Sequence, residues 1–159
     1  MEKEHSYQTR LKWTGNRGRG TLDYRAYDRD YVITSPNKPE ILGSSDLSFL
    51  GDKSKYNPED MLVASLSACH MLCYLHVCAV AGVVITDYVD NATGTMTEAE
   101  NGGGKFRSVT LYPTVTVLDE TMVNTAAKLH HEAHKLCFIA SSVNFPVTHQ
   151  PTIKTVSDQ

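Results

Sequence analysis

The chain has 159 residues, of which 41% are hydrophobic and 21% charged, as expected for one globular domain with its own core. Its formal net charge of -3 argues against a nucleic-acid-binding protein, which would carry a basic face. No apolar stretch follows Met1, and the longest apolar run, residues 71–85, contains a histidine and two cysteines, so we expect neither a secretory signal nor a membrane span. We therefore expect a single cytoplasmic domain over residues 1–159 that binds neither nucleic acid nor membrane. In that compartment its four cysteines favour free thiols, catalytic thiols or metal ligands over structural disulfides.

The first third of the chain is predicted to form short strands. β-Branched, aromatic and charged residues without helical period predict strands over residues 7–14, 21–27 and 30–34. The glycine-rich stretch 15–20 predicts a tight turn between the first two. A polar, proline-containing loop is expected from residue 35 to residue 56. This part of the sequence therefore predicts a small antiparallel β-meander.

A long helix is predicted next. Asn57 is a suitable N-cap, Pro58 suits the first helical position, and Glu59 and Asp60 are acids in the first turn. The helix is expected to continue to about residue 81, where Gly82 would end it. Apolar residues are dense on all its sides, which predicts a long, buried central helix.

The last half of the chain is predicted to alternate between strands and one further helix. Residues 83–97 and 106–118 are expected to form two long strands joined by a hairpin that contains three consecutive glycines. Asp119 is expected to cap a second helix that begins at residue 120 or 121 and ends at about residue 140. Residues 147–155 are expected to form a last strand. The predicted fold class is α+β, with an N-terminal β-meander, a long buried central helix, antiparallel strands and a second helix.

Cys69 is the first candidate for chemistry. It shares one face of the predicted helix with Ser65, Cys73 and His76, whereas Cys78 points to the opposite side and is expected to be an inert core thiol. Packing as a small hydrophobic residue is the commoner role of a single buried cysteine. Cys69 stands out because Cys137 lies in a second helix-like run beside polar residues, and two such thiols could undergo oxidation and disulfide closure if the fold brought them together.

A positive charge would be needed to activate such a thiol. An arginine beside a cysteine lowers the pKa of the thiol, and Arg17 in its glycine-flanked turn is our first candidate. The alternatives are the other arginines of the N-terminal region, Arg19, Arg25 and Arg29. Glu59 lies nearly three helical turns before Cys69, too far to touch it along the helix, but could anchor an arginine. By itself, Glu59 is explained as an acid at a helix N-terminus.

Three segments of the chain, residues 13–21, 57–70 and 133–147, form a recognisable pattern. Its most specific parts are the Asn-Pro-Glu helix start, Cys69 twelve residues after Asn57, and Cys137 sixty-eight residues further on. The pattern resembles that of the OsmC/Ohr family, osmotically inducible protein C and organic hydroperoxide resistance protein, over nearly the whole chain. Family members often have proline after the second cysteine, where this chain has Phe138.

The resemblance implies an antioxidant stress-response enzyme, a thiol-dependent peroxidase that reduces organic hydroperoxides to alcohols without a cofactor. By resemblance, Cys69 would be the peroxidatic thiol that becomes a sulfenic acid, and Cys137 would resolve it as a Cys69–Cys137 disulfide. Arg17 and Glu59 would activate and orient Cys69. The resemblance also implies an intertwined homodimer and a lipoyl-type dithiol as reductant.

Two details of this interpretation remain open at the level of sequence. Cys73 could compete with Cys137 as the resolving thiol. Apolar residues near Cys69, among them Leu66, Leu72 and Phe138, would favour an alkyl hydroperoxide over hydrogen peroxide if they lined the pocket, although they could equally belong to the core.

Two other functions compete with the peroxidase. His130, His134 and Cys137 stand at helical spacings of four and three and could bind zinc, with Cys69 or His76 as a further ligand. A solvated or partly buried helix face is the more ordinary interpretation of that spacing, and His134 or a second histidine, His70, could instead tune a nearby thiol. The other alternative is a small-ligand-binding protein of the same fold without redox turnover.

Overall fold

The computed structural model describes residues 3–158. Contacts within the chain divide it into two compact units, one ending at Met61 and the other beginning at Leu62. The division falls inside the first turns of helix α1, Pro58–Val80.

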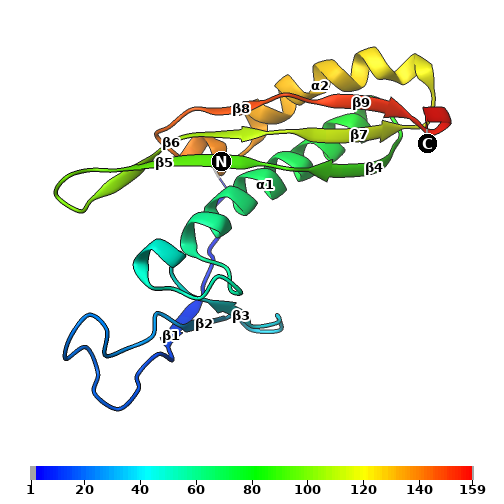
Figure 1. The fold of residues 1–159 in the computed structure, drawn as a ribbon. Helices are drawn as coiled ribbons and strands as arrows, with labels where there is room; N and C mark the ends of the chain where they lie inside the picture. Colours follow the sequence, from blue (N-terminus) through cyan, green and yellow to red (C-terminus); the bar gives the residue numbers. More distant parts are fainter. Residues whose placement is uncertain (1–2, 159) are drawn as a thin grey trace. The chain divides into compact units, whose positions relative to one another are not determined.

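The first unit contains a three-stranded antiparallel sheet with the strand order β1-β2-β3 (Figure 1). Its strands are β1 (Arg10–Trp13), β2 (Tyr31–Thr34) and β3 (Ile41–Gly43). The predicted N-terminal meander is confirmed, but its composition differs. Residues 21–27 are not a strand, and the third strand lies within the stretch expected to be a loop.

Local hydrogen bonds explain why residues 21–27 do not pair as a strand. The Arg29 guanidinium donates to the carbonyls of Tyr27 and Tyr24 at 2.5 and 2.6 Å, and it lies 4.2 and 4.3 Å from the centroids of the same two rings. The Asn16 side chain accepts from the backbone N–H groups of Gly18 and Gly20. Such side-chain bonds to nearby backbone compete with strand pairing, and they fold the segment into a loop.

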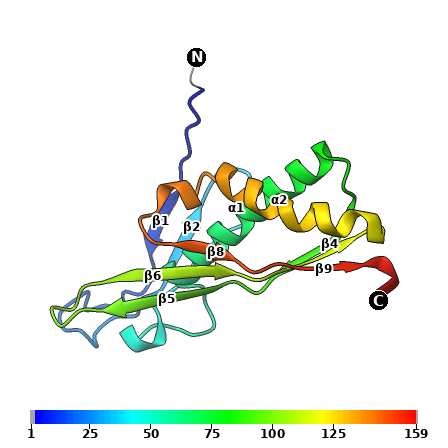
Figure 2. The same cartoon turned by 90° about the horizontal axis from the view of Figure 1, so that it is seen from above.

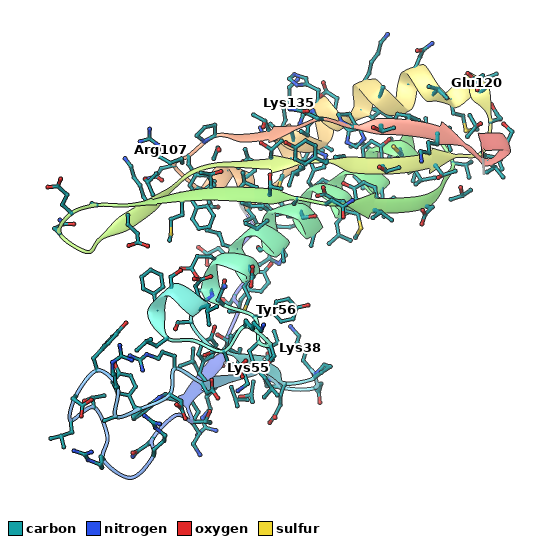
Figure 3. All side chains as sticks on the ribbon, viewed as in Figure 1. Lys38, Lys55, Tyr56, Arg107, Glu120 and Lys135 are labelled. Carbon is teal, nitrogen blue, oxygen red and sulfur yellow. The ribbon has the colours of Figure 1, made fainter. Side chains whose placement is uncertain are left out.

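The segment before α1 contains a short 3-10 helix, η1 (Leu47–Phe49). Lys55, which is labelled in Figure 3, connects this segment to the start of β2. Its ammonium group pairs with Asp30 at 2.5 Å and with Asp52 at 3.2 Å. Asn57 caps α1 as predicted, since its Oδ1 accepts the N–H of Asp60 at 2.7 Å.

Helix α1 is buried along one stripe in the single chain, rather than on all sides. The stripe has a spacing of four residues and consists of Leu66, His70, Tyr74 and Cys78. By length and composition alone α1 could also cross a membrane, which corrects the expectation that no segment qualifies. Ser67 and His70, however, bond to other side chains of the second unit, as expected for a helix packed within a folded domain.

The second unit builds two three-stranded sheets, β4-β7-β9 and β5-β6-β8. The two predicted long strands and the last strand are each divided in two, and the six resulting strands are β4 (Ile85–Asp90), β5 (Thr93–Glu98), β6 (Gly104–Leu111), β7 (Pro113–Val117), β8 (Val147–His149) and β9 (Thr152–Thr155). The predicted antiparallel pairing is confirmed for β4 with β7 and for β5 with β6. It is wrong for β8 and β9, which pair in parallel with β6 and β7.

Asp90 lies where the strands break. Its carboxylate accepts the backbone N–H of Tyr112 at 2.7 Å and the hydroxyl of Ser67 at 2.5 Å. Pro113 and Pro151 stand beside the other two breaks, and a proline cannot donate to a strand ladder. Each of these residues lies at a break in a long strand. Asp90 also links its break to α1 through Ser67.

The second helix, α2 (Val123–Leu136), begins after the 3-10 turn η2 (Glu120–Met122) and is followed by η3 (Ala140–Ser142), with η4 (Val156–Asp158) near the end of the chain. Asp119 caps the 3-10 turn, as its side chain accepts the N–H of Thr121 at 2.9 Å. Both helices lie on the same face of the strand layer (Figure 2). The main core lies between them and β7, with Tyr74 and Cys78 of α1 beside small α2 residues such as Ala126 and Ala133.

Candidate functional site

Three cysteines of the second unit lie near one another, two on α1 and one just beyond α2. The Cys69 thiol is close enough to Cys73 and Cys137 to raise the pKa of both thiols. All three are free thiols; Cys69 and Cys73 are partly exposed, and Cys137 is 1% exposed. The two sulfur atoms singled out in the sequence are thus neighbours, and a third joins them. We call Cys69, Cys73 and Cys137 the thiol cluster.

The end of α2 explains how Cys137 is positioned. The helix was predicted to continue to about residue 140, but it ends at Leu136, and Cys137 follows with an extended backbone at φ -73° and ψ 105°. The N–H of Ala140 donates to the Cys137 sulfur at 3.4 Å, and the Ser141 hydroxyl donates to the Cys137 carbonyl at 3.0 Å. The turn after the helix therefore fixes this sulfur.

Burial controls the protonation of Cys137. Loss of hydration raises the pKa of the Cys137 thiol to about 11, and the contact with Cys69 acts in the same direction against the lowering effect of the Ala140 N–H. The pKa of Cys73 is also raised, first by burial and then by Cys69. Cys137 is consequently a thiol, not a thiolate, at neutral pH in the reduced protein.

Exposed apolar residues flank the cysteines of the thiol cluster in sequence. Leu72 next to Cys73 is 63% exposed, and Leu136 and Phe138 on either side of Cys137 are 50% and 80% exposed. Leu66, grouped with them in the sequence, is fully buried and packs in a core with Val109 and Leu111. Leu66 therefore does not contribute to the exposed apolar surface of these residues.

Arg17 and Glu59 belong to the first unit. The Arg17 guanidinium pairs with Asp28 at 3.7 Å and donates to the carbonyl of Arg25. Glu59 lies in the first turn of α1 and contributes, after burial, to the raised pKa of Tyr31. The ion pairs among residues 3–158 do not include one between Arg17 and Glu59. Their part in activating Cys69 stays a prediction.

A group of histidines lies close to the cysteines in sequence. The spacing of His130 and His134 predicted only part of this group. Nε2 of His70 lies 3.0 Å from Nδ1 of His130, and both rings are buried. Tyr74 stacks on His130 with ring centroids 3.8 Å apart, and His149 stacks on both histidines. We call His70, His130, His149 and Tyr74 the aromatic stack.

The histidines of the aromatic stack are neutral. Burial, followed by the neighbouring histidines, lowers the pKa of His70 to about 4 and that of His130 to about 3. The place of His70 in the stripe Leu66, His70, Tyr74, Cys78 was the sequence signal for this burial.

The zinc hypothesis is wrong for the part of the chain that the structure describes. Across residues 3–158, no three His, Cys, Asp or Glu side chains are arranged to hold a metal ion. His130 bonds to His70, whereas Cys137 interacts with Cys69. The helical spacing of His130, His134 and Cys137 therefore reflects packing between α1, α2 and β8.

The chain is thus a small α+β protein in which a free thiol of α1, Cys69, lies near a second free thiol just beyond α2, Cys137. A family model described as OsmC-like protein matches residues 51–152. The chain therefore belongs to the OsmC-like family, and the resemblance read from the sequence is confirmed. A comparison with curated proteins finds no match.

Solved structures agree with this membership. An OsmC-like protein of unknown function from Vibrio cholerae is 27% identical, with a TM-score of 0.84 over 94% of this chain and 100% of that one. Organic hydroperoxide resistance proteins from Elizabethkingia anophelis and Legionella pneumophila, at 19% and 20% identity, both have a TM-score of 0.66. They cover 96% and 95% of this chain, and each is covered over 99% of its own length. At that identity these two show a shared fold.

Proposed function

We propose that this protein is a cysteine-based peroxidase that reduces organic hydroperoxides to alcohols. The observation that carries the proposal is the proximity of the Cys69 and Cys137 thiols, one partly exposed and the other buried, since Cys69 raises the pKa of Cys137. Membership of the OsmC-like family, in which two solved structures are named organic hydroperoxide resistance proteins, supports the same activity.

The reaction follows from thiol chemistry. The Cys69 thiolate attacks the distal oxygen of ROOH, the O–O bond breaks, and the alkoxide leaves and takes a proton to give ROH. Cys69 is then a sulfenic acid. The Cys137 sulfur attacks the Cys69 sulfur and the hydroxyl group departs as water, so that an S–S bond replaces the S–O bond. An external dithiol of the lipoyl type reduces the disulfide by two exchange steps.

The different environments of the two thiols suit an ordered reaction. Cys69 is partly exposed and can meet the hydroperoxide first. Cys137 is buried and protonated because its pKa is raised to about 11, so it does not compete for the hydroperoxide. When it attacks the sulfenic acid, its own proton can leave with the departing hydroxyl group as water.

The surroundings of the thiol cluster favour an apolar substrate. The sequence neighbours of the thiols, Leu72, Leu136 and Phe138, offer exposed hydrocarbon. An alkyl or aryl hydroperoxide would cover part of it, whereas hydrogen peroxide would not. The remaining outward apolar surface of α1, which includes Val80 at 76% exposure, suits the intertwined homodimer that we propose. In this proposal Arg17 and Glu59 are the pair that activates Cys69. The protein is proposed to act in the cytoplasm.

Consumption of cumene hydroperoxide with a dithiol present tests the proposal. The wild-type protein should consume it catalytically, and a Cys69→Ser variant should not. Cys78→Ala is the matched control because Cys78 is a fully buried α1 thiol of the main core that does not belong to the thiol cluster. Consumption equal in wild type and Cys69→Ser would contradict the proposal.

A further inference from the structure

Cys73 is a thiol that the proposed two-cysteine cycle does not use. It lies one helical turn after Cys69 on α1, and its sulfur interacts with Cys69. It also donates to the carbonyl of Leu136, the residue directly before Cys137, at 3.5 Å. Cys73 is therefore close to both members of the proposed redox pair, one helical turn from Cys69 and bonded to the residue before Cys137, and it is partly exposed.

Helical geometry prevents Cys73 from closing a disulfide with Cys69. Residues four apart on a helix have Cβ atoms about 5–6 Å apart, whereas a disulfide needs Cβ atoms about 3.5–4.5 Å apart. Cys69 and Cys73 both lie well inside α1, far from its frayed ends. The direct competition with Cys137 that the sequence left open would thus require α1 to unwind.

The route from Cys73 to Cys137 has no such restriction, because Cys137 lies beyond the end of α2 on a different element. We propose that Cys73 is a third redox thiol, which attacks the Cys69–Cys137 disulfide at the Cys137 sulfur and moves the disulfide to Cys73–Cys137. This proposal rests on the proposed function, since that function generates the first disulfide.

The exchange is balanced without an added oxidant or reductant. Cys73 loses its proton to solvent, the S–S bond between Cys73 and Cys137 forms, and the bond between Cys137 and Cys69 breaks. The electron pair leaves on Cys69, which becomes a thiolate again. One disulfide and one thiol enter the exchange, and one disulfide, one thiolate and one released proton leave it.

The direction of attack follows from the helix. An attack on Cys69 would join two residues one turn apart on α1, which the spacing of their Cβ atoms prevents. An attack on Cys137 needs no such bond, and it releases Cys69. Burial also raises the pKa of Cys137 to about 11, which makes Cys137 a slow leaving group.

The exchange would have two consequences for the enzyme. Cys69 would be ready for a second hydroperoxide before the reductant arrives. The reductant would meet a disulfide that includes the partly exposed Cys73 instead of Cys69. The class of partner is the same external dithiol as in the proposed function, but its point of attack is different.

Single-turnover stoichiometry tests this relay. Reduced wild-type protein, freed of dithiol and offered two equivalents of cumene hydroperoxide per chain, should consume about two, because Cys69 is oxidised, released and oxidised again. Cys73→Ser should consume about one, because Cys69 stays in the disulfide. Cys78→Ala, the matched control on the same helix, should behave as wild type.

Mass spectrometry of the same samples identifies the bonds. After one equivalent of hydroperoxide and alkylation of free thiols, wild type should contain a Cys73–Cys137 link, with fragmentation spectra to separate Cys73 from Cys69 on their shared peptide. Cys73→Ser should contain only Cys69–Cys137. A wild type that forms Cys69–Cys137 but keeps Cys73 alkylated and consumes about one equivalent overturns the relay and leaves the peroxidase standing. A wild type in which Cys69 does not react overturns both.

Discussion

Cys69 and His70 are consecutive residues of α1, yet they belong to opposite kinds of environment. Cys69 is partly exposed and meets other thiols, one of them just beyond the end of α2. His70 is 1% exposed, belongs to the aromatic stack and forms a hydrogen bond with His130 of α2. Both groups connect the same two helices. The thiol cluster offers reactive atoms to a ligand, and the aromatic stack offers none.

This difference separates function from stability along one helix. Removing the partly exposed Cys69 thiol should change the chemistry and leave the fold intact, because this sulfur contributes little to the buried core. Changing the aromatic stack should alter stability and leave the chemistry intact, because its rings fill the space between α1 and α2. The predictions below test each half of this statement.

Loss of the Cys69 nucleophile should have the largest effect. Cys69→Ser should reduce hydroperoxide turnover by about 10³-fold or more, while its free energy of unfolding stays within about 0.5 kcal/mol of wild type. Peroxide consumption and urea denaturation measure the two quantities. A variant that loses stability together with activity would show that Cys69 is a packing residue.

Loss of Cys137 should affect a later step. In Cys137→Ala the sulfenic acid of Cys69 has lost the nearby thiol proposed to resolve it, so it should persist and react with further hydroperoxide to give the sulfinic acid. Turnover with a dithiol should fall about 10-fold or more, because an external thiol lacks the effective concentration of a neighbouring one. Intact mass after peroxide treatment should show the added oxygens, and a clean return to the reduced mass would contradict this role.

The sequence was sufficient for the parts of the fold that depend on local signals. The cap at Asn57 and the glycine at residue 82, which has φ +73°, mark the ends of α1 correctly. The parallel pairing of β8 and β9 was not predictable, because it depends on where the chain returns after α2. Residues 21–27 have strand-like composition, but the local bonds of Arg29 decide their conformation.

The candidate site was predictable in the same partial way. Cys69 and Cys137 could be chosen from the sequence, because two thiols in similar helical settings and the family pattern both selected them. The contact of Cys73 with Leu136 was not visible, since it requires α2 to end at Leu136 instead of near residue 140. The pairing of His70 with His130 likewise needed the relative placement of two helices, which spacing along one helix does not supply.

The aromatic stack should make stability depend on pH. The folded-state pKa values of His70 and His130 are lowered to about 4 and about 3 from about 6.5 in the unfolded chain. The unfolded state therefore binds more protons between pH 6.5 and pH 4, and stability is full above pH 6.5 and falls as the pH falls through this window. The slope should reach at most about 1.4 kcal/mol per pH unit for each histidine.

Denaturation with urea at pH 7.5 and pH 5.0 measures this dependence. His130→Phe keeps a flat ring against Tyr74 and cannot be protonated, so it should weaken the loss of stability at pH 5.0 while hydroperoxide turnover stays near that of wild type. His131→Gln is the matched control, because His131 is the neighbouring, exposed histidine of α2. An unchanged pH dependence in His130→Phe would show that the buried pair does not resist protonation.

The smallest effect is expected from the one hydroxyl of the aromatic stack. The Tyr74 hydroxyl donates to the carbonyl of Ala126 on α2 at 3.0 Å, and burial raises the pKa of Tyr74 far above its usual value. Tyr74→Phe keeps the ring stacked on His130 and removes this single bond, so it should lower the free energy of unfolding by about 0.5–1.5 kcal/mol. Denaturation at pH 7.5 measures the change, and the decrease at pH 5.0 should be similar, because the histidines are untouched. A loss several times larger would mean that this hydroxyl positions α2 against α1, and peroxide turnover, which depends on Cys137 at the end of α2, should then fall as well.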